Sequence, residues 1–110
     1  MSVETWVFEQ LAAYGWARDE THQLRAGTRK YETAVGLKQA SVRLNRGSEH
    51  ERYYLTAYYE SEGRNAAACC FAFIPMTASE DEVATAVDAF IDAVDKAISE
   101  TYAVRLIKAA

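Results

Sequence analysis

The sequence predicts an α+β fold: an antiparallel sheet of three or four strands, preceded by an N-terminal helix and followed by a long C-terminal helix, in the order α-β-β-β-α. Three observations predict it: a helical apolar stripe near each end of the chain, and a strand-turn-strand pattern between residues 52 and 75. Half of the 110 residues are apolar and only one is proline, so we expect a single globular α+β domain over residues 1–110.

The first helix is predicted over residues 3–14 by apolar side chains at helical spacing: Val3, Val7, Leu11 and Tyr14. Ser2 stands at the N-cap position, and Gly15 fits the left-handed conformation that ends many helices. Residues 16–28 mix charges with few periodic apolar residues, which predicts a loop with room for a short second helix.

The next segment shows strand alternation that changes phase. Residues 31–37 alternate in one phase, and Val42 and Leu44 continue in the other. A change of phase indicates a bulge or a tight turn, which we place at residues 38–41. Turn-forming residues 45–48 follow, before a polar loop at 49–51.

Two strand-like runs, RYYLTAYYE and NAAACCFAFIP, flank the short segment SEGR and predict a β-hairpin. Pro75 ends the second strand because it has no N–H to donate. A capping box can then form from either of two pairs, Thr77 with Glu80 or Ser79 with Glu82.

The closing helix is predicted over residues 79–100, where an apolar stripe faces a largely acidic side. Its apolar members are Val83, Val87, Phe90, Val94, Ala97 and Ile98. Residues 101–110 alternate at period two, so they are either a further strand or more helix.

Pairing the hairpin about its turn gives two apolar faces. One face is apolar and rich in small side chains, which lets the helices approach it closely. It carries Tyr53, Leu55, Ala57, Tyr59, Ala66, Ala68, Cys70, Ala72 and Ile74. The other face is aromatic, and its candidate interface residues are Tyr54, Thr56, Tyr58, Phe71 and Phe73, beside Ala67 and Cys69.

A hairpin that is apolar on both sides needs cover on the second face. Either the N-terminal helix or a loop bearing Trp6 and Trp16 packs there, which gives three layers, or a second copy or another protein covers it. Tyrosine suits an interface because its ring buries area while its hydroxyl stays in water.

The net charge of −4 gives no electrostatic reason to bind nucleic acid or anionic lipid, and it suits a basic protein partner. No run is long and apolar enough for a membrane helix, and the start lacks the pattern of a signal peptide, so we expect a cytoplasmic protein.

Residues that could support catalysis or bind a metal are few. His22 and His50 both fall in predicted polar loops, and the consecutive residues 49–51 cannot readily face one metal ion. Cys69 and Cys70 are adjacent and are read as reduced strand residues. The sequence has no glycine-rich phosphate loop, HExxH or EF-hand pattern, so we expect no cofactor, no metal and no enzyme activity.

The order helix, three strands, helix resembles the double-stranded RNA-binding domain. In that family the start of the final helix is rich in lysine and faces phosphates. Here this segment reads TASEDEVAT, with Glu80, Asp81 and Glu82, so the resemblance does not extend to RNA binding.

These observations predict a non-enzymatic protein-interaction module: a small cytoplasmic regulator, inhibitor or adaptor that acts as a homodimer through the aromatic face. The alternative is a small-ligand-binding domain or a non-catalytic subunit of an enzyme, because an apolar pocket leaves little trace in a sequence.

Overall fold

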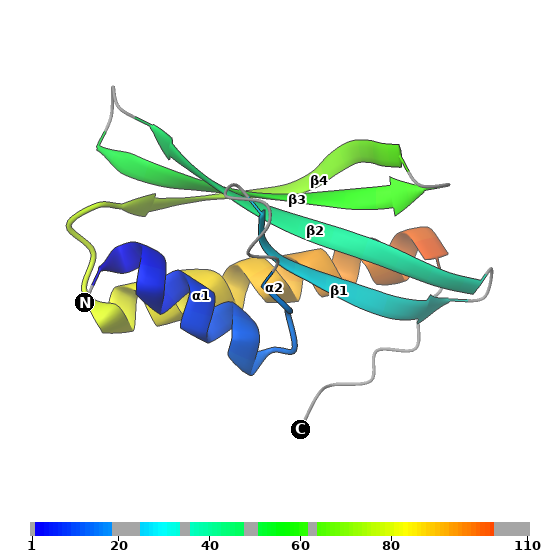
Figure 1. The fold of residues 1–110 in the computed structure, drawn as a ribbon, viewed down its shortest axis with the longest axis horizontal. Coiled ribbons are helices and arrows are strands. Elements are labelled where there is room, and N and C mark those ends of the chain that lie inside the picture. Colours follow the sequence, from blue (N-terminus) through cyan, green and yellow to red (C-terminus); the bar gives the residue numbers. More distant parts are fainter. Residues whose placement is uncertain (1, 19–24, 34–35, 48–50, 62–63, 103–110) are drawn as a thin grey trace.

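The computed structural model describes residues 2–18, 25–33, 36–47, 51–61 and 64–102. The elements follow the order α-β-β-β-β-α, which confirms the α+β class and the two terminal helices and adds a strand to the expected order. They are α1 (Val3–Ala13), β1 (Arg25–Thr33), β2 (Gly36–Gly47), β3 (Arg52–Ser61), β4 (Arg64–Pro75) and α2 (Glu80–Tyr102) (Figure 1).

The four strands form one antiparallel meander, in which each strand pairs with the next along the chain. Both helices lie side by side on the same face of this sheet (Figure 1). Of the two alternatives for covering the aromatic face, the one in which α1 or the loop with Trp6 and Trp16 packs there is therefore wrong. Val7, Leu11 and Trp16 are buried in the same core as α2, and the described chain forms two layers.

The N-terminal helix begins and ends where the sequence predicts. The backbone N–H of Thr5 donates to Oγ of Ser2 over 3.3 Å, and Gly15 adopts a φ of +85°. The apolar stripe of α1 reaches the core, while Trp16 packs edge-on against Tyr31 with ring centroids 6.3 Å apart.

Strand β1 begins earlier than expected. Arg25 to Thr28, predicted as loop, already pair with β2, and Thr28 also exchanges backbone hydrogen bonds with Ala17. The reversal between β1 and β2 falls between the paired residues Thr33 and Gly36, not at 38–41. Strand β2 is continuous from Gly36 to Gly47, so the change of phase marks a turn that lies a few residues earlier.

The hairpin of β3 and β4 is confirmed. Tyr53 pairs with Ile74, Leu55 with Ala72 and Ala57 with Cys70, all on the face that meets the helices. Beyond these pairs the register shifts, and Ala68 comes opposite Tyr58 where uniform pairing would place Cys69. The faces expected for Ala66 to Cys69 therefore do not follow from simple alternation. A bulge sets two residues of one strand opposite one residue of its partner, so the alternation between the faces changes phase.

The C-terminal helix starts with the second of the two possible capping boxes. The backbone N–H of Ser79 donates to Oε1 of Glu82 over 3.1 Å, and the backbone N–H of Glu82 donates to Oγ of Ser79 over 3.2 Å. The apolar stripe is buried as expected except for Ala97, which is only partly buried, and Ile91 joins the stripe. The helix extends to Tyr102, and the question of residues 103–110 lies outside the described residues.

No helix in the described ranges is both long enough and apolar enough to cross a membrane.

Candidate interaction surface

The five candidate interface residues lie together on the sheet face that points away from both helices, here called the outer face. Tyr54, Thr56 and Tyr58 alternate along β3, and Phe71 and Phe73 alternate along β4. Tyr54 pairs with Phe73, and Thr56 pairs with Phe71. Paired residues on neighbouring strands share a face, so the predicted juxtaposition of these side chains is present.

The outer face is closed in its middle and open toward β4. Thr56 is 5% exposed, and Ser41 of β2, which pairs with Tyr58, is fully buried. By contrast, Phe71 is 67% exposed and Phe73 is 54% exposed. A partner would therefore meet the two phenylalanine rings first, while Thr56 lies beneath its neighbours.

The rings are held in a defined arrangement. Tyr54 and Phe73 meet edge to face, with centroids 5.1 Å apart and planes at 81°. The Tyr54 ring also lies over Gly47 of β2, where a Cβ atom would overlap it. The missing side chain at Gly47 thus leaves a seat for the tyrosine on the outer face.

Two arginines that the sequence analysis did not single out complete this surface. The guanidinium of Arg43 lies 5.0 Å from the ring centroid of Tyr58, and that of Arg52 lies 5.3 Å from the centroid of Phe73. A cation over an aromatic ring is attracted to the negative face of the ring. The signal was present in the sequence, because Arg52 shares the period-two phase of Tyr54, Thr56 and Tyr58.

The net charge conceals a separation of charge between the two layers. The two helices carry nine Asp and Glu residues and one lysine, whereas the four strands carry eight Lys and Arg residues and two glutamates. On the outer face, Lys30, Arg43 and Arg52 outnumber Glu32 among the described charged side chains. The surface that exposes aromatic rings is therefore locally basic, although the whole chain is acidic.

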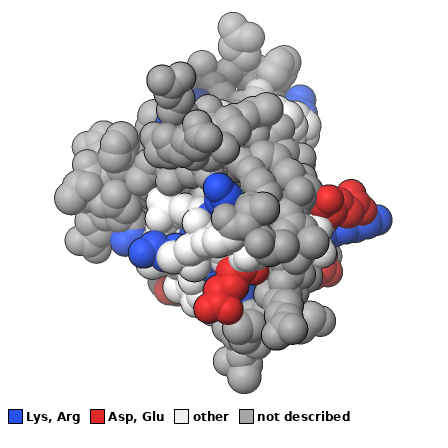
Figure 2. Space-filling model, turned by 90° about the vertical axis from the view of Figure 1, so that its right-hand side faces the viewer, with Lys and Arg blue, Asp and Glu red and all other residues white. Residues whose placement is uncertain are grey.

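The separation is between the acidic helical layer and the basic sheet, and the described side chains at the end of the sheet do not show it. Figure 2 views the side where β1 turns toward β2 and β3 turns toward β4. There, the described acidic and basic side chains lie next to one another, and among them neither sign forms a continuous patch.

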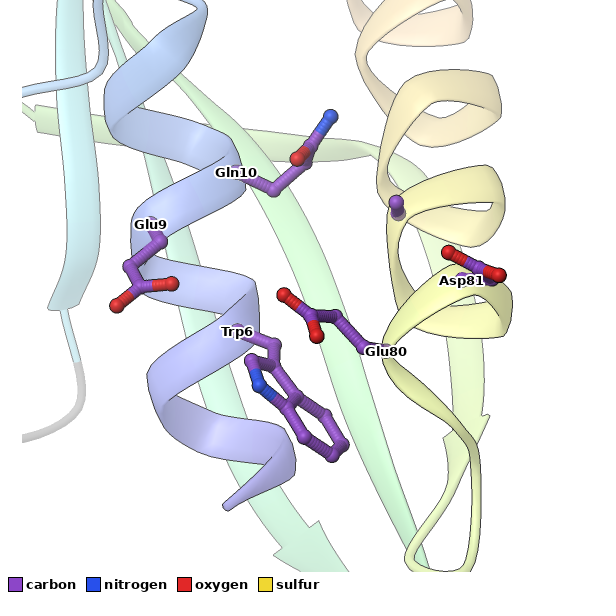
Figure 3. Close-up of a pocket in the computed structure, with 6 residues that line it drawn as sticks. Trp6, Glu9, Gln10, Glu80 and Asp81 are labelled. Atoms are coloured by element: carbon purple, nitrogen blue, oxygen red, sulfur yellow. The ribbon is translucent and has the colours of Figure 1, made fainter. Parts of the chain in front are cut away.

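One place to test for a small ligand is a cleft between α1 and α2. Its volume is about 160 Å³, and it is lined by Trp6, Glu9, Gln10, Glu80, Asp81 and Ala84 (Figure 3). Sites for drug-sized ligands usually measure ~300–1,000 Å³. This cleft is too small for such a ligand, and its three carboxylates give it an acidic lining.

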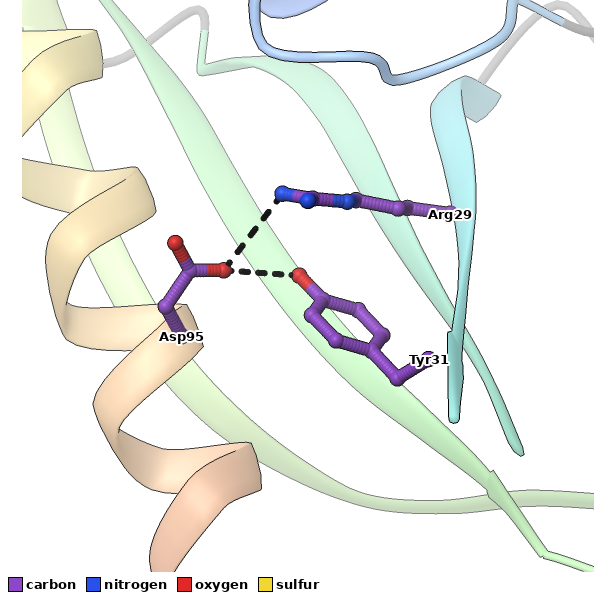
Figure 4. Close-up of polar contacts among 3 residues, drawn as sticks. All are labelled: Arg29, Tyr31 and Asp95. Carbon is purple, nitrogen blue, oxygen red and sulfur yellow. Dashed lines mark hydrogen bonds and ion pairs between the residues drawn. The ribbon is translucent and has the colours of Figure 1, made fainter. Parts of the chain in front are cut away.

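The clearest polar cluster ties the sheet to α2. Oδ1 of Asp95 accepts a hydrogen bond from the Tyr31 hydroxyl at 2.9 Å and lies 3.7 Å from Nη1 of Arg29 (Figure 4). Burial, followed by the charge of Asp95, raises the pKa of Tyr31 far above its usual value. A general acid or base needs a pKa near the working pH, so Tyr31 does not suit that role, and its contact links β1 to α2.

The other residues considered for chemistry contribute little to a site. Among the described residues, no group of histidine, cysteine and acidic side chains is placed to hold a metal ion. Cys70 is half-buried against the core and forms no disulfide. His22 and His50 lie outside the described residues.

Comparisons of the chain with protein-family models, curated proteins and solved structures found no match. The interpretation of the outer face therefore depends on its geometry and charge.

Proposed function

We propose that the chain is a non-enzymatic protein-interaction module that binds an acidic partner protein through its outer face, as a regulator, inhibitor or adaptor in the cytoplasm. The observation that carries this proposal is the exposure of Phe71 and Phe73 on a sheet face that neither helix covers. Large exposed apolar side chains set among polar groups mark interaction surfaces.

The composition of the outer face supports a protein partner. Tyrosine, phenylalanine and arginine are enriched in protein interfaces and among the residues that dominate their binding energy. The edge-to-face packing of Tyr54 on Phe73 and the two cation-π contacts hold several of these side chains in place. Binding then costs less conformational entropy than it would for mobile side chains.

The charges favour an acidic partner over a second copy docked face to face. Two outer faces in contact would bring Lys30, Arg43 and Arg52 of one copy toward the same cations of the other. Like charges at an interface oppose binding, whereas opposite charges speed association. The basic partner expected from the net charge would suit the helical layer, which has no exposed phenylalanine among its described residues.

Single-stranded nucleic acid is the other occupant that an aromatic and basic sheet would suit, because bases stack on exposed rings. Here Arg52 lies over the Phe73 ring and Arg43 over the Tyr58 ring, and Tyr54 meets Phe73 edge to face. These contacts occupy faces of Phe73 and Tyr58 that stacked bases would need. Among the described residues, Phe71 is the exposed ring that has no such contact, and one ring does not form a platform for successive bases. A protein partner is therefore favoured, and an oligonucleotide enters the experiment as a competing outcome.

The test begins with a photo-crosslinking amino acid in place of Phe71, used in the cells that make the protein, with the same group in place of exposed Asp92 on α2 as control. We expect position 71, and not position 92, to capture one acidic protein. The captured protein is then purified, and its affinity is measured by calorimetry at two salt concentrations.

Phe71→Ser and Arg52→Glu should each weaken that affinity by roughly tenfold or more, and added salt should weaken the wild-type complex. Asp92→Arg, which reverses a charge on the opposite layer, should leave the affinity unchanged. Equal effects of Arg52→Glu and Asp92→Arg would overturn the proposal. Tight binding of a uridine or thymidine oligomer that Phe71→Ser abolishes would replace it with nucleic-acid binding.

A further inference from the structure

Strand β4 forms one edge of the sheet, and its outer side is open. In the order β1-β2-β3-β4 it pairs only with β3, and no other segment of the described chain pairs with its far side. The backbone along Arg64–Pro75 therefore presents N–H and C=O groups to whatever lies beside it. Such an edge is a template for another strand unless something protects it.

The two edges of the sheet differ in their protection. Strand β1 carries Arg25, Arg29, Lys30 and Glu32, and Ala17 pairs with it at Thr28. Strand β4 has no charged residue from Asn65 to Pro75. Charged side chains and local cover are the usual devices that prevent edge pairing, so the protection is concentrated on β1.

The side of α2 next to this edge carries small side chains. α1 packs near β1 and α2 packs against β4, so α2 is the helix at the β4 side of the molecule. Asp88 of α2 points to α1, where it binds Gln10 and Tyr14. At 100° per residue, the side of α2 opposite Asp88 carries Ala86, Ala93 and Ala97, together with Phe90, which is buried in the core. A second helical layer can approach this side closely.

We propose that β4 pairs antiparallel with β4 of a second copy, so that a two-fold dimer contains one continuous eight-stranded sheet. A strand that meets itself across a two-fold axis brings each of its residues close to the same segment of the other copy. The uncharged stretch from Asn65 to Pro75 makes this contact free of like-charge repulsion, which β1 would not.

The dimer also explains where the exposed phenylalanines lie. Phe71 and Phe73 are on the edge strand itself, so pairing would bring the rings of both copies together on one face. The outer faces of the two copies would then form a single platform that stays open to a partner. The dimer is thus independent of the partner docking proposed above, and it can be tested on the purified chain alone.

The experiment combines sedimentation velocity over a range of protein concentrations with amide hydrogen exchange read by mass spectrometry. We expect a reversible dimer. Amides within residues 65–74 should exchange at least tenfold more slowly at high than at low concentration, whereas those within 25–33 should not change. Backbone protection distinguishes edge pairing from stacking of sheet faces, because only edge pairing adds hydrogen bonds along β4.

Phe71→Lys should convert the chain to a monomer, since self-pairing of the uncharged stretch puts the two-fold axis near residue 70 and so places the two lysines close together. Leu37→Lys is the matched control, because Leu37 is also exposed (61%) but lies on β2, away from this edge. It should leave the dimer intact, and both variants should keep the wild-type circular dichroism spectrum. A wild-type chain that stays monomeric, or a dimer without added protection in β4, would overturn the proposal.

Discussion

The hydroxyl of Tyr31 on β1 donates a hydrogen bond to Asp95 on α2, over 2.9 Å and 64 residues of sequence. This bond joins an edge strand of the sheet to the C-terminal half of the long helix. Arg29 reaches the same carboxylate from the same face of β1, so Asp95 makes a hydrogen bond and an ion pair with one strand. The contact helps to hold α2 on the inner face of the sheet, so that neither helix covers the outer face.

The raised pKa of Tyr31 predicts a loss of stability at high pH. Tyr31 keeps its proton in the folded protein at pH values where the unfolded chain, with a tyrosine pKa of ~10, releases it. The stabilisation is therefore complete below pH ~10 and decreases as the pH rises further. Tyr31→Phe should lower the free energy of unfolding by about 1 kcal/mol at pH 8.

Because phenylalanine does not titrate, the stability difference between the two proteins should change by about 1.4 kcal/mol between pH 8 and pH 11, from about 1 kcal/mol in favour of the wild type to a small advantage for the variant. Urea denaturation at both pH values measures it. A difference that stays constant with pH would show that Tyr31 titrates normally in the folded protein.

Asp88 joins the two helices and gives a second prediction. Its Oδ1 accepts hydrogen bonds from Nε2 of Gln10 and from the Tyr14 hydroxyl, both at 2.7 Å. Asp88→Ala removes both bonds and should cost about 1–3 kcal/mol of unfolding free energy. Asp92→Ala, an exposed acid one turn later, should stay within ~0.5 kcal/mol of wild type.

The same substitution should change the titration of Tyr14. The hydrogen bond to Asp88 is the largest cause that raises the pKa of Tyr14, so this pKa should fall toward its usual value in Asp88→Ala. Ultraviolet titration, with Tyr14→Phe to assign the signal, measures the shift. An unchanged Tyr14 titration would contradict the hydrogen bond.

The capping box of α2 gives a third prediction, with a control inside the sequence. Ser79→Ala removes the hydroxyl that accepts the Glu82 N–H and should cost about 1 kcal/mol, as N-cap losses commonly do. Thr77→Ala alters the other sequence-compatible pair and should be nearly neutral. Thermal denaturation of both variants decides between the two pairs, and equal losses would contradict the assignment.

Local patterns in the sequence were enough to predict most of the fold. The ends of α1 followed from Ser2 and Gly15, and the hairpin followed from its period-two runs and Pro75. The turn between β1 and β2 was misplaced because alternation from Tyr31 to Leu37 continues across it by coincidence. Leu37 is exposed, and the better signal was Gly36, whose φ of +108° is one that favours glycine.

Contacts between distant residues decided what the sequence could not predict. The start of β1, Arg25 to Thr28, was predicted as loop, yet Thr28 pairs with Ala17 and the strand continues into Arg29, which lies 3.7 Å from Asp95. The shared face of Tyr54, Tyr58 and Phe73 followed from periodicity, but their exposure depends on where both helices pack. Net charge also concealed the basic outer face, because it averages over two layers of opposite sign.

Two glycines of the sheet should respond differently to a methyl group, and this contrast tests the packing on both faces. A Cβ on Gly27 would lie 2.9 Å from Cβ of Trp16, next to the backbone, where neither side can easily move. Gly27→Ala should therefore cost about 1–3 kcal/mol, as overpacked cores do. A Cβ on Gly47 would meet only the far end of the Tyr54 side chain, which can swing away.

Gly47→Ala should accordingly change the unfolding free energy by less than ~1 kcal/mol while it moves the Tyr54 ring off its seat. The ring currents on Phe73 in NMR spectra report that movement, since the two rings now meet edge to face at 5.1 Å. Urea denaturation of the two alanine variants measures the stability contrast. If Gly47→Ala were the more damaging of the two, Tyr54 would be fixed by its surroundings. The outer face would then be pre-organised more firmly than the contact of Tyr54 with Gly47 alone indicates.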